Sequence, residues 1–168
     1  MDLVGIAEIV SAAAVLVGFG FAVSEVKRHR GHKARESALA LVSAYQTPEF
    51  ANAIVRLIEL PGGLTKEGLH KCCESDVKLV GLLMTTWESL GVLTYRREVS
   101  LELLDDFFSG PIMLSWEKFE KLVREMREES GRETYFEWFQ WLAERMLDRE
   151  TEAEPVPAHV QHRDWRPR

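Results

Sequence analysis

The sequence has only two cysteines among its 168 residues, and they are adjacent, at Cys72 and Cys73. Neighbouring cysteines are poorly placed to bridge each other. Spaced cysteine pairs of the kind that bind structural zinc do not occur either. We therefore expect free thiols, and no fold that depends on disulfides or on structural zinc.

Other signatures of common functions are also missing. The sequence contains no phosphate-binding glycine loop, no internal repeat and no alternating strand pattern. It has no basic face with interleaved aromatic residues, and its formal net charge is −6. Because nucleic acids are bound largely through positive charge, we expect no nucleic-acid partner.

Charge is missing from the first part of the chain, since no residue of Ile9–Val23 carries one. Glu8 and Lys27, on either side, lie about 28 Å apart along a helix with a rise of about 1.5 Å per residue. That distance matches the ~30 Å hydrocarbon core of a bilayer. A signal peptide would carry its basic residues before the apolar run, not after it. The pattern predicts a transmembrane helix over Leu3–Val26.

Five basic residues follow the apolar run directly: Lys27, Arg28, Arg30, Lys33 and Arg35. Positively charged segments stay on the cytoplasmic side, so the N-terminus is expected outside and the remaining chain in the cytosol. The same five residues are expected to contact anionic lipid of the bilayer. The sequence thus predicts a single-pass protein of the cell (plasma or inner) membrane.

Steps of three and four residues along the expected span place one set of side chains on a single face. The set continues beyond the span and comprises Glu8, Ser11, Val15, Gly18, Ala22, Glu25, His29 and His32. The six positions within the span fall in an arc of about 100° on a helix. Ala14, Gly18 and Ala22 add a spacing of small residues that lets two helices approach closely.

Three interpretations of this face remain open. It can be a packing seam in a homo-oligomer, or a coincidence in an anchor that packs on nothing. It can also line a pore, with Glu8 and Glu25 as acidic rings that select cations. In a pore, His29 and His32 would respond to pH, because imidazole titrates near neutrality.

Helix signals follow one another after the basic cluster. Thr47, Thr65 and Ser100 each precede a helical stretch and provide a capping hydroxyl, and Thr134 starts the last helix. A break is expected at residues 109–111, where serine, glycine and proline follow one another. The expected helices cover residues 35–45, 48–60, 66–74, 75–95, 101–108, 112–129 and 135–147, and the first of these can continue the transmembrane helix with a bend at Gly31. The fold class predicted is all-α, with a cytosolic bundle of about five or six helices after the transmembrane helix.

The last of these helices is aromatic on nearly all sides, because it carries Phe136, Trp138, Phe139 and Trp141. A helix that is apolar on more than one face needs more than one partner. It is either the central strut of the domain or it turns one face to a second subunit or to the bilayer surface. Trp138 and Trp141 are the candidates for an interaction surface.

The best metal-like cluster comprises Glu67, His70, Cys72 and Cys73. Its Glu-x-x-His spacing is that of di-iron helical bundles, but such a site needs two copies of the motif and the chain has one. A cysteine nucleophile would need a histidine base oriented by a third group, and nothing supplies the third group. We therefore expect no metal, no cofactor and no catalytic residue, and the chain is not expected to be an enzyme.

The run from Trp87 to Arg127 resembles a family of small bacterial and archaeal proteins. The matching features are Glu88-x-x-Gly91-Val92, the leucines at 101, 103 and 104 that lead into Asp106 and Phe107, and Trp116 with the arginine-bearing helix after it. The resemblance implies one N-terminal span, a helical domain of unknown function and membrane anchorage. It implies no activity.

Three segments are expected. Residues 1–31 form the transmembrane helix and basic segment, residues 32–149 the cytosolic helical domain, and residues 150–168 a disordered tail. The function expected is a membrane-anchored interaction module that self-associates as a homo-oligomer or docks an unknown protein partner. The alternative is a homo-oligomeric ion channel lined by the first helix, and an enzyme ranks third.

Overall fold

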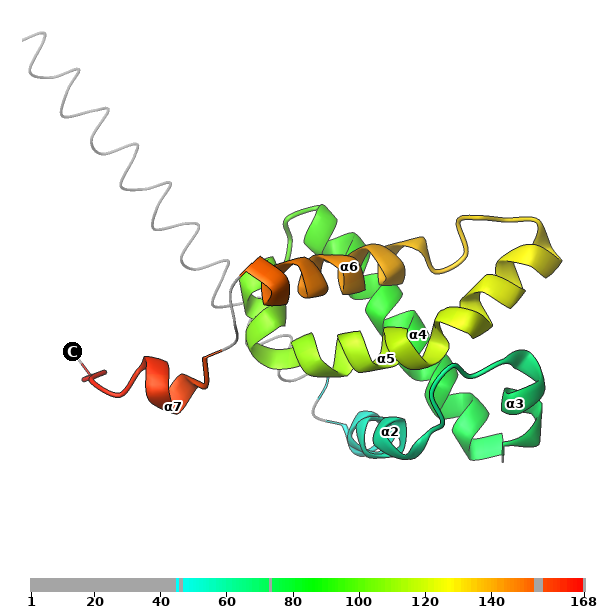
Figure 1. Ribbon diagram of the computed structural model, residues 1–168, viewed down its shortest axis with the longest axis horizontal. Helices are drawn as coiled ribbons and strands as arrows, with labels where there is room; N and C mark the ends of the chain where they lie inside the picture. Colours follow the sequence, from blue (N-terminus) through cyan, green and yellow to red (C-terminus); the bar gives the residue numbers. More distant parts are fainter. Residues whose placement is uncertain (1–44, 46, 73, 153–155, 168) are drawn as a thin grey trace, which may run out of the picture. The chain divides into compact units, whose positions relative to one another are not determined.

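The computed structural model describes residue 45 and residues 47–72, 74–152 and 156–167 (Figure 1). By its contacts the chain divides into two units, Met1–Ser43 and Ala44–Arg168, and every described residue belongs to the second. The described residues form helices, turns and loops and contain no strand. The all-helical interpretation of the sequence is therefore confirmed.

Six helices appear in the described part of the chain: α2 (Pro48–Glu59), α3 (Lys66–Lys71), α4 (Glu74–Tyr95), α5 (Leu101–Ser130), α6 (Glu137–Glu152) and α7 (Ala158–Gln161). Helix α4 packs against both α2 and α6, and α5 packs against α6 and α2. In Figure 1, α6 runs above α5, and α4 passes behind both. The central element is thus α4, which we expected over residues 75–95.

The three predicted capping residues, Thr47, Thr65 and Ser100, cap their helices. The hydroxyl of Thr47 accepts from Phe50 N at 3.2 Å, and that of Thr65 from Gly68 N at 3.0 Å. The hydroxyl of Ser100 accepts from Leu103 N at 3.1 Å. Each bond pairs one backbone N–H that a helix leaves without a partner in its first turn.

The expected break at residues 109–111 is wrong, because α5 runs through Pro111 as one bent helix (Figure 1). Proline removes one backbone hydrogen bond of a helix and bends it. Tertiary packing holds the two halves together, since Ile112 just after the proline is fully buried. The hydroxyl of Ser115 also donates to the carbonyl of Pro111 at 2.7 Å.

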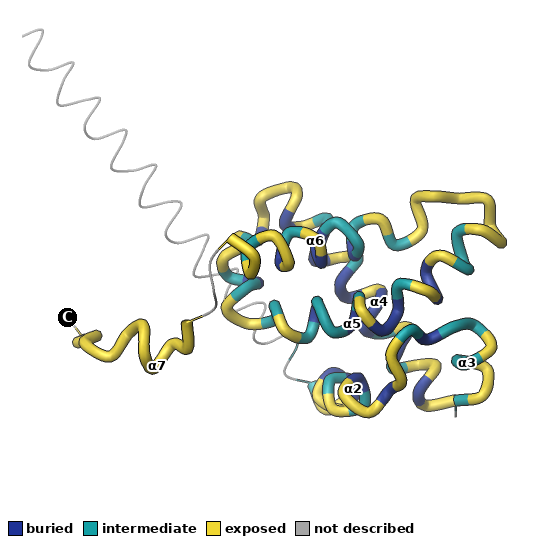
Figure 2. Tube along the Cα trace, in the orientation of Figure 1, coloured by how far each residue is buried: buried dark blue, intermediate teal, exposed yellow. Residues whose placement is uncertain are grey.

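The core lies between α2, α4, α5 and α6, where the buried stretches of the tube in Figure 2 face one another. Its largest buried side chains are Trp87, Phe119, Phe139, Leu57, Leu83 and Leu90. The indole Nε1 of Trp87 donates to the Ser115 hydroxyl at 2.9 Å, so its one polar atom is paired. Val77, which the sequence places on the apolar stripe of α4, is 40% exposed.

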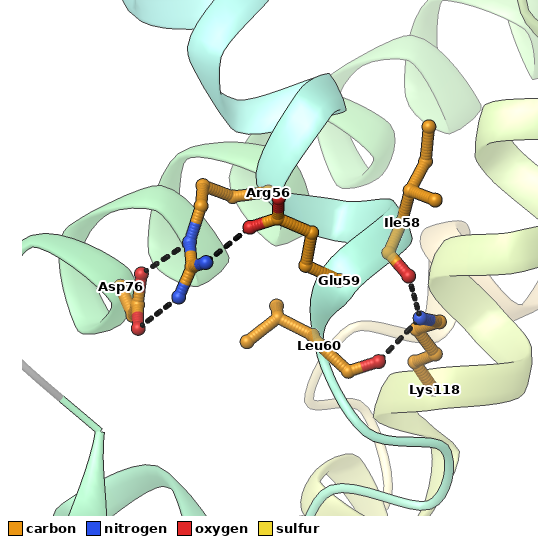
Figure 3. Close-up of polar contacts among 6 residues, drawn as sticks. All are labelled: Arg56, Ile58, Glu59, Leu60, Asp76 and Lys118. Carbon is orange, nitrogen blue, oxygen red and sulfur yellow. Dashed lines mark hydrogen bonds and ion pairs between the residues drawn. The ribbon is translucent and has the colours of Figure 1, made fainter.

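Two cationic side chains fasten the end of α2 to the helices beside it (Figure 3). Arg56 donates through Nε and Nη2 to the two carboxylate oxygens of Asp76 in α4, at 2.9 and 2.8 Å. Lys118 of α5 is buried and donates to the carbonyl of Ile58 at 2.9 Å and to that of Leu60. A buried ammonium is tolerated where such acceptors surround it.

The prediction of a fold with one membrane-spanning helix has to be corrected. No helix in the ranges that the structure describes is both long and apolar enough to cross a bilayer. The two long helices, α4 and α5, are interrupted by charged residues such as Lys78, Glu88 and Lys118. This finding contradicts the membrane-spanning fold, and the single-pass membrane location with it.

The residues on which that prediction rested lie outside the described part of the chain. They are the expected span Leu3–Val26, the face from Glu8 to His32 and the basic cluster from Lys27 to Arg35. The two remaining candidates, Trp138 and Trp141, are both described.

Candidate functional site

Helix α4 crosses the beginning of α6 at very short range. A Cβ atom added to Gly91 would lie 2.3 Å from the carbonyl oxygen of Trp138, closer than any side chain can come. One turn earlier, a carboxylate oxygen of Glu88 accepts from Phe139 N at 2.8 Å. The Glu88-x-x-Gly91 spacing thus has a structural meaning, because its glycine admits the backbone of α6 and its acid caps that helix.

The carboxyl group of Glu88 is half-buried, and burial raises its pKa above the usual value for glutamate. The backbone N–H groups of Phe139 and Trp138 act in the opposite direction, because they stabilise the charged form. Burial is the larger effect, so the folded protein holds this proton more tightly than an unfolded chain does.

The turn before α6 is fixed from α5 by one arginine. The guanidinium of Arg127 donates to the carbonyls of Tyr135 and Phe136, at 2.8 and 3.4 Å, and to the side chain of Gln140 at 2.7 Å. Phe136 takes a left-handed backbone conformation with φ of 52°. The helix therefore begins at Glu137, two residues after the position expected from the sequence.

These contacts present three aromatic side chains together on the outside of the domain. Tyr95 at the end of α4 lies 4.8 Å from Trp138 and 6.2 Å from Trp141, between ring centroids. The two tryptophan rings lie 6.1 Å apart. Tyr95 is 62% exposed and both tryptophans are half-buried. We call Tyr95, Trp138 and Trp141 the aromatic surface.

A cavity of about 560 Å³ adjoins the aromatic surface, and Tyr95 and Trp141 form part of its wall. Arg97, Ser100 and Arg145 also line it, so two guanidinium groups border an aromatic wall. Arg97 has a left-handed backbone with φ of 60°. Such a conformation is uncommon for a residue other than glycine, and it occurs more often at binding sites than elsewhere.

Arg145 has one donor without a partner. Its Nη2 atom lies 2.8 Å from a carboxylate oxygen of Asp148. Its Nε atom is buried, and no hydrogen-bond acceptor meets it within the part of the chain that the structure describes. A buried donor without an acceptor costs free energy in the folded protein. That atom is closed off from solvent, so what the cavity presents is the charge of two guanidinium groups, those of Arg97 and Arg145.

Comparison with known protein families identifies one family that matches most of the chain. The family model described as a domain of unknown function, DUF4760, matches residues 6–146. The chain belongs to the DUF4760 family. The match includes the Glu88-x-x-Gly91 spacing and the aromatic surface, and it ends within α6. No curated protein and no solved structure matches the chain.

The resemblance stated from the sequence is thus confirmed as membership of a family without an assigned function. Sequence reasoning found two members of the aromatic surface in this DUF4760 chain and missed Tyr95, Arg97 and Arg145. Tyr95 and Arg97 stand where α4 ends, and only the fold brings them to α6. Arg145 was missed because it reads as one of several charges on an amphipathic helix.

The metal-like cluster is dispersed in the described chain. Glu67 forms an ion pair with Lys71 at 2.7 Å, and the thiol of Cys72 donates a hydrogen bond to the Gly68 carbonyl at 3.4 Å. His70 lines a separate cavity of about 370 Å³ between α3 and α5. No group of three or more potential ligands gathers among the residues that the structure describes, and Cys73 lies outside them. That no metal binds remains a prediction.

Proposed function

We propose that this chain is a helical protein-interaction module that docks a partner polypeptide on the aromatic surface. The observation that carries the proposal is the gathering of Tyr95, Trp138 and Trp141 on the outside of the domain. Tryptophan, tyrosine and arginine are the residues most enriched where protein interfaces gain their binding energy. All three types meet here.

The charged residues that line the cavity indicate which class of partner would bind there. Two arginines and one acid, Glu102, line it; Arg145 pairs with Asp148 at 2.8 Å, whereas Arg97 has no ion pair among the described residues. A carboxylate matches a guanidinium through two parallel hydrogen bonds. The partner is therefore a polypeptide segment that places an apolar side chain on the aromatic rings and an aspartate or glutamate side chain in the cavity.

Binding of short synthetic peptides to the full chain tests this proposal. The peptides pair leucine or phenylalanine with a nearby glutamate, and each has a counterpart with glutamine in place of the acid. The fluorescence of the tryptophans reports binding. We expect the acidic peptides to bind at least tenfold more tightly than their counterparts, because a carboxylate forms charge-assisted hydrogen bonds with a guanidinium group and an amide does not.

Two substitutions assign that binding to the surface. Trp141→Ala removes a ring of the wall and Arg145→Gln removes the charge, and each should weaken binding of the acidic peptides about tenfold or more. Trp165→Ala is the matched control, because Trp165 is exposed and lies in the tail. Equal binding of acidic and neutral peptides, or equal loss with Trp165→Ala, would overturn the proposal. Circular dichroism checks that each variant is folded.

The channel required the membrane-spanning helix and is not carried forward. That the chain is not an enzyme, has no cofactor and binds no nucleic acid remain predictions, as does the bacterial or archaeal origin that the family resemblance implied. Self-association also remains a prediction, and the opposite face of α4 bears on it.

A further inference from the structure

One side of α4 carries a row of exposed residues. Gly81, Thr85 and Ser89 lie on it at intervals of four residues, and all three are exposed. Val77 and Leu93 border it and are 40% and 39% exposed. On a helix these five positions form one continuous strip, which we call the outer face.

The outer face is unusually poor in charge and in free polar groups. Between Leu79 and Tyr95 the helix has one charged residue, Glu88, and that side chain caps α6 instead. The hydroxyls of Thr85 and Ser89 donate to carbonyls one turn earlier in their own helix, each at 2.8 Å. In a chain of which 29% is charged, a solvated helix face would be expected to carry more charge.

Opposite charges mark the two ends of this strip. Glu74 lies eleven positions before Thr85 and Arg96 eleven positions after it, and both are exposed. The helical hydrogen bonding reaches Arg96, whose N–H donates to the Val92 carbonyl at 3.0 Å. At 100° per residue both charges fall within about 20° of the direction of Thr85. Lys78 lies in the same direction and pairs with Glu74 at 2.7 Å, so one end of the face carries this exposed ion pair and the other end carries the positive charge of Arg96.

We infer that a second copy of this chain docks on the outer face, with the two α4 helices antiparallel and Thr85 on the two-fold axis. That arrangement puts Glu74 of each copy opposite Arg96 of the other and Gly81 opposite Ser89. The contact uses the same face of both copies, as a two-fold interface requires. A parallel arrangement would place like charges together at both ends.

The remaining features of the face suit the same occupant. Small residues at its centre let two helix backbones approach closely. The guanidinium of Arg96 has no ion pair within the described chain, and Glu74 shares one with Lys78 at 2.7 Å while both stay exposed. Antiparallel helix dipoles attract one another as well. The outer face is therefore complementary to the same face of a second copy of the chain.

Analytical ultracentrifugation of the full chain and its charge variants tests the inference. We expect a dimer that weakens at least tenfold with Glu74→Arg alone and with Arg96→Glu alone. The double variant exchanges the two charges, so its dimer should return to within about threefold of the original affinity. Glu128→Arg is the matched control, because it makes the same charge change at an exposed position of α5, and it should leave the dimer unchanged.

A cross-link gives a geometric readout that is independent of affinity. With Cys72 and Cys73 replaced by serine, Thr85→Cys should form a disulfide-linked dimer on mild oxidation, because residues on a two-fold axis meet their own copies. Glu128→Cys should not. A monomer, a double charge variant that stays weak, or equal cross-linking at the two positions would overturn the inference. Trp141→Ala should leave the dimer intact, which separates this face from the aromatic surface.

Discussion

Two glycines of α4, ten positions apart, lie in opposite surroundings. A Cβ at Gly91 would lie 2.3 Å from the Trp138 carbonyl oxygen, whereas a Cβ at Gly81 would meet nothing within 4 Å. Glycine in the middle of a helix costs about 0.5–1 kcal/mol of stability relative to alanine. At Gly91 the close packing of α6 offsets that cost. At Gly81 no contact in the described chain does so.

The difference shows how one helix can serve two purposes. The inner face of α4 is shaped by its neighbours, since Trp87, Leu90 and Gly91 are buried and Glu88 holds the start of α6. The outer face is regular and has no neighbour among the described residues. No contact among the described residues requires a glycine at position 81, and a close contact with a second molecule would use one.

Replacing Gly91 by alanine tests the inner face and should have the largest effect. The added methyl group would collide with backbone atoms, so α6 must shift and its capping bond with Glu88 must lengthen. Overpacking of a core typically costs 1–3 kcal/mol, and we expect about 3 kcal/mol here because a helix backbone has to move. Urea unfolding followed by circular dichroism measures it. A loss below about 0.5 kcal/mol would show that α6 adjusts freely.

The sequence predicted correctly those features that depend on interactions between residues close together in the chain. The hydroxyls of Thr47, Thr65 and Ser100 cap their helices as expected, because a cap involves residues only three positions apart. Pro111 shows the limit of that reasoning. Proline disfavours the interior of a helix, yet α5 continues through Pro111 because the neighbouring residue, Ile112, is buried in the core.

The candidate site could be predicted only in part for the same reason. Trp138 and Trp141 stand out because large aromatic residues on several sides of a helix cannot all be buried. The roles of Glu88 and Tyr95 depend on α6 crossing α4, a contact between positions about 40–50 apart in sequence. Spacing along the chain carries no sign of such a contact.

Substitutions of Glu88 test the capping bond and should have the next largest effect. Glu88→Ala leaves the N–H of Phe139 without its acceptor and should cost about 1–2 kcal/mol, the usual range for a lost helix cap. Glu88→Gln keeps an acceptor oxygen and serves as the control, so it should lose less. Equal losses in the two variants would mean that the packing of the side chain matters more than the bond.

The pH dependence of the same residue has a definite sign. Burial raises the pKa of Glu88 in the folded protein, so the folded state binds this proton more tightly than the unfolded state. Stability from this group is therefore full below the unfolded pKa of about 4.3 and is lost as pH rises through the folded value. The stability of the original protein relative to Glu88→Gln should fall between pH 4 and pH 7. A rise would mean that the charged carboxylate is the better cap.

Replacing Gly81 by alanine tests the outer face and should have the smallest effect, with the opposite sign to Gly91→Ala. The methyl group meets nothing within 4 Å among the residues that the structure describes, and alanine reduces the conformational freedom of the unfolded state. We expect a gain of about 0.5–1 kcal/mol in the free energy of unfolding. Urea unfolding must be measured at a concentration where the chain is monomeric, so that only the fold contributes. At higher concentration the same methyl group faces Ser89 of the second copy, and any weakening of the dimer would show that glycine is kept at this position for the contact rather than for the fold.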